Sequence, residues 1–134
     1  MIYVQGGTKQ QRKYALSMAE FVCNKFDINP DVEIYFRRLT NDRSLGGCVS
    51  LDDNEYEIDL KRSMRMRDML TTLAHELVHV KQYELGQLDH SAEADYDYWD
   101  KPSEIEAHGR ETGLFITWAE SQRLGHKKWT KIPG

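Results

Sequence analysis

The chain has 134 residues, of which 30% are charged and 40% hydrophobic, and its formal net charge at pH 7 is −4. This length predicts a single domain, residues 1–134, that is large enough to bury a core. The charge gives no indication of nucleic-acid binding, and no apolar run is long enough for a signal peptide or a membrane span. We therefore expect neither a nucleic acid nor a membrane as a partner. The two cysteines, Cys23 and Cys48, predict free thiols in a reducing compartment, the cytoplasm.

The first third of the chain predicts a strand, a helix and a second strand. Ile2–Val4 is a short apolar run that ends at Gly6-Gly7, and Thr8 can cap a helix that continues through Phe26. Asn29-Pro30 breaks the chain, and Val32–Leu39 has strong β propensity with strict alternation. The buried stripe expected for the helix is Tyr14, Met18, Phe21, Val22 and Phe26. One face of the strand is Val32, Ile34 and Phe36, and the other is Glu33, Tyr35 and Arg37.

The middle of the chain predicts a β-hairpin followed by a long helix. Asn41–Arg43 and Gly46-Gly47 have loop composition, and Cys48–Leu51 and Glu55–Leu60 flank a turn at Asp52-Asp53-Asn54. Met64–Leu85 contains no Gly or Pro, and Gly86 is a candidate helix stop. Apolar residues recur in this helix at intervals of three or four, which predicts a core-facing stripe of Met66, Met69, Leu70, Leu73, Leu77 and Val80.

The last third predicts a linking segment, a helix and an irregular tail. Gln87–Lys101 is rich in acids and tyrosines, and a helix is expected from about Pro102 to Leu124. Ser103 and Glu106 have the spacing of a capping box. Core contacts are expected from Ile105, Leu114, Phe115 and Trp118. The order of these elements predicts an α+β fold, with an N-terminal helix, a small sheet of three to four strands that includes antiparallel pairing, and two further helices.

The most informative motif is His75-Glu76-Leu77-Val78-His79, an HExxH pentapeptide within the Met64–Leu85 helix. Histidines four residues apart share one helix face, so both imidazoles can bind one zinc ion. Glu76 lies roughly 100° around the helix, where it can contact a water on the metal without being a ligand. A shuffled chain of this composition contains HExxH on the order of one or two times in a hundred, so the alternative is a surface helix with a chance match.

A catalytic zinc ion usually has three protein ligands and one open position, so a third ligand is expected. The metzincin pattern is excluded because Gln82 and Leu85 stand where it requires Gly and His. The best candidate is Glu104, which follows His79 by 25 residues, near the start of a helix, where a carboxylate is stabilised. The alternatives are Glu106, His90, Glu93 and His108.

HELVH followed by a helix with Glu104-Ile105-Glu106-Ala107-His108 resembles the gluzincin metallopeptidases, over about residues 55–118. In many of them the third ligand begins a Glu-x-x-Ala-Asp pattern, whose Asp supports a zinc-binding histidine. Here His108 replaces that Asp. The resemblance is closest to short metallopeptidase-like proteins of phage and bacterial genomes, which would place a phage-encoded chain in the host cytoplasm. It implies a minimal zincin-like domain with His75, His79 and Glu104 as ligands of Zn²⁺.

The same resemblance implies hydrolysis of peptide bonds, with Glu76 as general base and His108 as a further catalytic or substrate contact. Peptides or extended protein segments are the expected substrates, and the strand Glu55–Leu60 is a candidate cleft edge. Alternative functions are a zinc-bearing regulatory or binding module and a phage structural protein. Candidate oxyanion stabilisers are Tyr96, Tyr98, His108 and His126. Candidate acceptors for hydrogen bonds from the zinc-binding histidines are Asp59, Asp68 and Asp100.

Overall fold

The computed structural model describes residues 1–38 and 45–131. Within these ranges it has four strands, four α-helices and two short 3₁₀ helices. In chain order they are β1 (Ile2–Gln5), α1 (Lys9–Lys25), β2 (Asp31–Arg37), β3 (Gly46–Asp52), β4 (Glu55–Lys61), α2 (Met66–Glu84), α3 (His90–Glu93), η1 (Tyr98–Asp100), α4 (Pro102–Ser121) and η2 (Lys128–Thr130). Residues 41–43, which the sequence predicts to be a loop, and the end of the Val32–Leu39 strand lie outside the described residues.

The four strands form one mixed sheet in the order β1-β2-β4-β3. β2 pairs in parallel with both β1 and β4, and β3 pairs with β4 as an antiparallel hairpin. The α+β class and the predicted small sheet of three to four strands with antiparallel pairing are therefore confirmed. β4 lies inside the sheet, so the prediction that it forms an open edge is wrong. The edge strands are β1 and β3, because β4 has β2 on one side and its hairpin partner β3 on the other.

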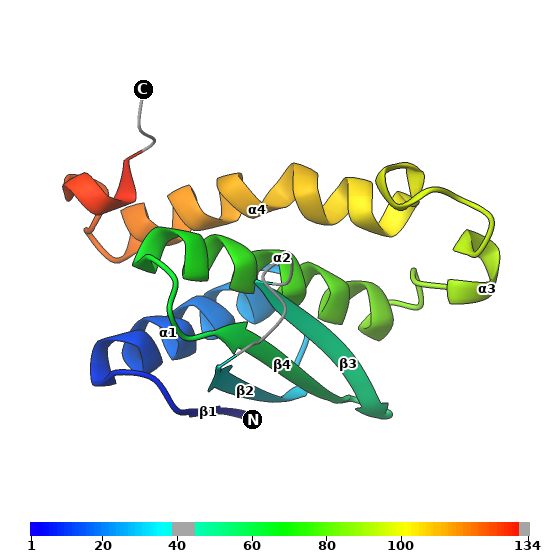
Figure 1. Cartoon of the computed structure of the whole chain (residues 1–134), viewed down its shortest axis with the longest axis horizontal. Coiled ribbons are helices and arrows are strands. Elements are labelled where there is room, and N and C mark those ends of the chain that lie inside the picture. Colours follow the sequence, from blue (N-terminus) through cyan, green and yellow to red (C-terminus); the bar gives the residue numbers. More distant parts are fainter. Residues whose placement is uncertain (39–44, 132–134) are drawn as a thin grey trace.

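The helices are stacked on one face of the sheet. α1 and α2 pack against the strands, and α4 packs on the far side of α2 (Figure 1). α2 is therefore buried between the sheet and α4, which explains why eleven of its residues are buried. Polar side chains are costly to bury in such a position unless they have partners, so the buried polar residues of α2 are of functional interest.

The core follows the predicted periodicities. β2 alternates strictly, with Val32, Ile34 and Phe36 buried, and α2 buries five of its six predicted stripe residues. Trp118 of α4 is fully buried, and its indole N–H donates to Ser17 Oγ at 3.0 Å. Thr8 caps α1 as predicted, in a capping box with Gln11.

Three predictions near α4 are wrong. Ile105 is 57% exposed, because it lies about 200° around the helix from the buried residue Ser103. Ser103 is the second residue of the helix rather than its N-cap, so no capping box forms with Glu106. The helix ends at Ser121 rather than Leu124, since Arg123 adopts a left-handed conformation (φ 59°) and Leu124 N–H bonds back to the Ala119 carbonyl at 2.8 Å.

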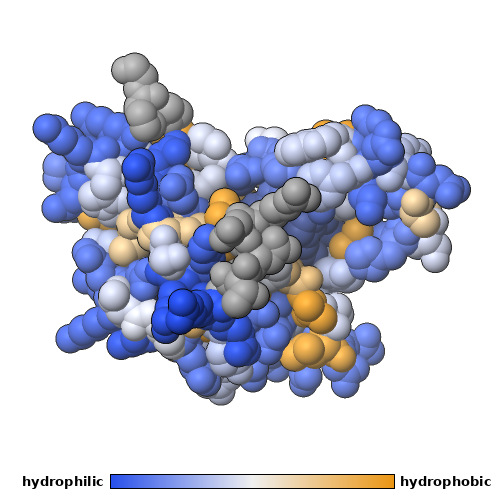
Figure 2. Space-filling model, in the orientation of Figure 1, coloured by the Kyte–Doolittle hydropathy of each residue, from blue (hydrophilic) through white to orange (hydrophobic). Residues whose placement is uncertain are grey.

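The face shown in Figure 2 is largely hydrophilic, with a small hydrophobic patch over β3, where Val49 and Leu51 are exposed. Among the helices of the described ranges, none combines the length and the apolar character that crossing a membrane requires.

Candidate metal centre

The HELVH residues lie in the middle of α2, where the helix passes between β3 and α4. His75 and Glu76 are each only 8% exposed. His75 and His79 are one helical turn apart, and their rings meet edge to face with centroids 5.0 Å apart. The motif is therefore part of the buried helix, and the alternative of a chance match on a solvated surface helix is not supported.

Glu104, in the first turn of α4, faces both histidines. Its carboxylate lies 3.0 Å from His75 Nε2 and 3.1 Å from His79 Nε2, through different oxygens. Neighbouring ligand atoms of a tetrahedral zinc ion with bonds of about 2.0–2.1 Å are about 3.3 Å apart. Glu104 thus approaches each histidine at nearly this spacing, and one ligand atom from each of the three side chains lies within 4.8 Å of the others. Their donors, two imidazoles and a carboxylate, are those that zinc prefers.

Both histidines are oriented by a side chain on the ring nitrogen that faces away from Glu104. His79 Nδ1 lies 2.8 Å from Gln82 Oε1, and His75 Nδ1 lies 3.3 Å from Glu111 Oε1. Such contacts fix the tautomer and the direction of a metal-binding histidine. The acceptors expected from the sequence were Asp59, Asp68 and Asp100, and none of them contacts a histidine in the described structure; Asp59 instead pairs with Arg37.

Glu106 points away from the candidate site and is held by two cations. It pairs with the buried Lys81 and with Arg110 at 2.8 Å, and it accepts a hydrogen bond from Gln82 Nε2 at 3.0 Å. Gln82 therefore connects Glu106 to His79. The structure gives Glu106 a supporting position rather than a place among the possible ligands.

The other proposed ligands are also engaged elsewhere. His90 Nε2 bonds the hydroxyl of Tyr83 at 2.7 Å, and both oxygens of Glu93 accept hydrogen bonds from Ser103, which secures the first turn of α4. Over the described residues, two His/Glu groups are compact enough to share a metal, and neither contains His90, Glu93 or Glu106. One group is His75, His79 and Glu104; the other is His75, His108 and Glu111, so His108 is the one alternative that remains near a possible metal position.

His108 and Tyr98 border the site. The Tyr98 hydroxyl donates to Glu104 Oε1 at 2.9 Å and lies 3.1 Å from His108 Nε2, while His108 Nδ1 lies 2.8 Å from Glu111. Burial, and then the bond to Glu104, raise the pKa of Tyr98, so its hydroxyl remains a proton donor at neutral pH. His126, another candidate oxyanion stabiliser, lies beyond the opposite end of α4.

Glu76 lies beside the three converging side chains, and in the described structure no hydrogen bond or ion pair occupies its carboxylate. Burial raises the pKa of Glu76, although the neighbouring histidines counteract this effect. A carboxylate with a raised pKa is a better proton acceptor for a reaction near neutral pH.

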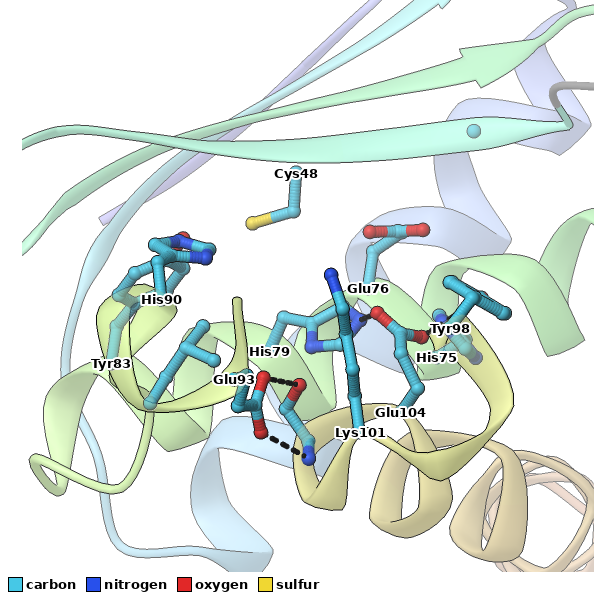
Figure 3. Close-up of a pocket in the computed structure, with 13 residues that line it drawn as sticks. Cys48, His75, Glu76, His79, Tyr83, His90, Glu93, Tyr98, Lys101 and Glu104 are labelled. Atoms are coloured by element: carbon cyan, nitrogen blue, oxygen red, sulfur yellow. Dashed lines mark hydrogen bonds and ion pairs between the residues drawn. The ribbon is translucent and has the colours of Figure 1, made fainter. Parts of the chain in front are cut away.

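The site opens into a pocket of about 300 Å³ between β3, α2 and the start of α4 (Figure 3). Cys48 projects into it from β3, opposite Glu76. Burial, and then the negative charge of Glu76, raise the pKa of the Cys48 thiol, and none of the described histidines bonds to it. Because the thiolate is the reactive form, these features do not support a cysteine nucleophile in this pocket.

Removing the Glu111 carboxylate is expected to weaken zinc binding about 10- to 100-fold, because His75 loses the group that orients it. The affinity of Glu111→Ala for zinc, measured by competition with a chromophoric chelator, checks this expectation. Glu120→Ala, an exposed substitution on the same helix, is the control. Equal affinities for the two variants would contradict the role of Glu111.

The metal-free protein is expected to lose stability as the pH rises from 6.5 to about 9. Burial lowers the pKa of His75, but hydrogen bonds to Glu104 and Glu111 outweigh it and raise the pKa from 6.5 to about 9. A raised histidine pKa stabilises the fold fully below the unfolded value and ceases to do so above the folded one. Zinc must displace this proton, so the zinc-induced increase in Tm should grow over the same range. Thermal unfolding with and without zinc measures both trends, and a zinc effect independent of pH would contradict them.

Comparison of the chain with protein-family models, curated proteins and solved structures found no match.

Proposed function

We propose that the chain is a zinc-dependent peptidase in which His75, His79 and Glu104 hold the metal. The observation that carries this proposal is the convergence of the three side chains at 3.0 and 3.1 Å, with Glu76 beside them and a pocket in front. A purely structural zinc ion has all four positions filled by protein and does not need an adjacent carboxylate base. A zincin-like arrangement and the resemblance of HELVH and Glu104 to the gluzincins belong to the same proposal.

Zinc, when bound, supplies Lewis acidity that acidifies water and polarises the carbonyl of the scissile bond. Glu76 acts as the general base, taking a proton from the attacking water and passing it to the leaving nitrogen. Tyr98 and His108 contact each other at the rim of the site and are the candidates to stabilise the oxygen on which negative charge develops. Tyr98 would do so by turning its single O–H away from Glu104, and His108 with a hydrogen on Nε2.

The substrate is proposed to be a peptide or an extended protein segment. β3 is an edge strand, and two of its residues, Gly46 and Cys48, line the pocket. An extended peptide can add to such an edge through main-chain hydrogen bonds while it passes the candidate metal centre. The cleft edge is thus assigned to β3 instead of the strand that directly precedes α2.

The test is the metal dependence of hydrolysis. The zinc-loaded protein is incubated with a mixed peptide library, and new peptide termini are identified by mass spectrometry. Cleavage is expected to cease after treatment with a chelator and to return with stoichiometric zinc, because Glu76 without a Lewis acid neither acidifies the water nor polarises the carbonyl. Cleavage that persists in the fully chelated protein would contradict the proposal.

A further inference from the structure

Lys101 places an ammonium group in the pocket. It lies immediately before α4, three residues ahead of Glu104, and its half-buried side chain is part of the pocket wall. Its chain extends across the pocket from α4 toward β3, in the direction of Cys48 and Glu76 (Figure 3). The pocket therefore contains a cation that is separate from the three converging ligands.

No carboxylate neutralises this ammonium group. In the described part of the chain, Lys101 Nζ makes no ion pair within 4.0 Å and no side-chain hydrogen bond. Lys81 shows the contrast, since its buried ammonium pairs with Glu106. Of the acids that line the pocket, Glu93 binds Ser103 and Glu104 faces the two histidines, while the third, Glu76, forms no ion pair with Lys101.

We propose that Lys101 binds a substrate carboxylate adjacent to the scissile bond. This inference rests on the proposed function and gives the pocket a preference for acidic peptides. A partly desolvated ammonium group attracts a carboxylate more strongly than one in bulk water, and it repels a cationic side chain. In a peptide this anion is either the side chain of Asp or Glu or the terminal carboxylate.

The size of the pocket is consistent with a contact close to the reacting bond. A volume of about 300 Å³ is at the lower end of the range for ligand sites, so it accommodates only the residues that flank the bond. Among the described residues that line the pocket, Lys101 is the one lysine or arginine. It is therefore the cation available to a substrate residue next to a bond whose carbonyl oxygen faces the candidate metal centre. Lys101 is thus assigned to specificity, and Glu76 to proton transfer.

A pair of metal-anchored probes tests the proposal without requiring turnover. Each probe is a small hydroxamate, which chelates zinc, on an alkyl arm of two to four methylenes that ends in either a carboxylate or the matching carboxamide. Their Kd values for the zinc-loaded protein are measured by calorimetry. For the best arm length, the carboxylate is expected to bind about 10-fold more tightly than the amide, the size of effect seen for charged hydrogen bonds.

The Lys101 variants assign this preference to one side chain. Lys101→Met is expected to reduce the carboxylate-to-amide ratio to about one, and Lys101→Arg to retain most of it. Lys101→Glu should favour an ammonium-terminated arm instead. Lys9→Met, an exposed substitution on α1, is the control and should keep the wild-type ratio. Equal affinities of the two wild-type probes, or a preference that survives Lys101→Met, would overturn the inference.

Failure of the proposed function would look different. If neither hydroxamate bound the zinc-treated protein, the metal centre itself would be wrong and the inference would fall with it.

Cleavage of a peptide library distinguishes the two sources of carboxylate. Cleavage sites flanked by an internal Asp or Glu would identify the side-chain carboxylate as the group that binds Lys101. Cleavage only next to free C-termini, and not next to amidated ones, would identify the terminal carboxylate.

Discussion

The Glu76→Gln variant is expected to hydrolyse peptides about 10²–10⁴-fold more slowly than the wild-type protein while it binds the same amount of zinc. Glutamine has nearly the shape of glutamate but cannot accept the proton of the attacking water. Glu76 is 8% exposed and forms no hydrogen bond or ion pair in the described structure, so the substitution breaks no structural contact. Initial rates of cleavage and zinc content are measured on the same preparations.

A matched control separates catalysis from a general effect of lost charge. Glu20→Gln removes a carboxylate from the exposed face of α1 and should leave both rate and zinc content unchanged. If Glu76→Gln retained wild-type activity with zinc bound, the proposed general base would be wrong, and the proton transfer would have to be assigned to another group.

The Glu104→Ala variant is expected to bind zinc more than about 100-fold more weakly than the wild-type protein, a larger loss than for a residue that only orients a ligand. Two histidines alone leave zinc with too few protein ligands for a catalytic site. Burial acts to raise the pKa of Glu104, but its contacts with His75 and His79 lower it well below its usual value, so the carboxylate is charged and available at neutral pH. Competition with a chromophoric chelator gives the Kd.

Glu120→Ala is the control for this variant, because it removes an exposed glutamate from the same helix. Glu120 lies away from the converging side chains, so zinc affinity should stay close to that of the wild type. Full zinc affinity in Glu104→Ala would instead move the third ligand to Glu106, His90 or another residue.

Patterns within single elements predict much of this fold. Alternation along Val32–Phe36 identifies the buried face of β2, and Thr8 marks the start of α1 within one residue. The neighbours of β4 in the sheet are not encoded in its own residues, and β4 was therefore misplaced at an edge. The segment 87–101 contains α3 and η1, which were not predicted. Asp89 caps α3 locally, but the contact of Glu93 with Ser103, which joins the segment to α4, is tertiary and cannot be read from the local sequence.

In the candidate site, too, the residues of one helix could be predicted from the sequence, whereas contacts between two helices could not. HELVH is recognisable because both histidines and Glu76 come from one helix, and Glu104 was singled out by a resemblance and by its place near a helix start. Glu111 and Gln82 were missed, although both share helix faces with site residues. Glu111 follows Glu104 by seven residues, and Gln82 follows His79 by three. Only the packing of α4 on α2 shows that these two side chains reach the histidines.

The most direct measurement is the zinc-to-protein ratio of the wild-type chain, determined by elemental analysis after purification without chelator. The geometry of His75, His79 and Glu104 predicts about one zinc ion per chain. A ratio near zero that does not rise after zinc is added back would contradict the metal centre, and with it the proposed peptidase.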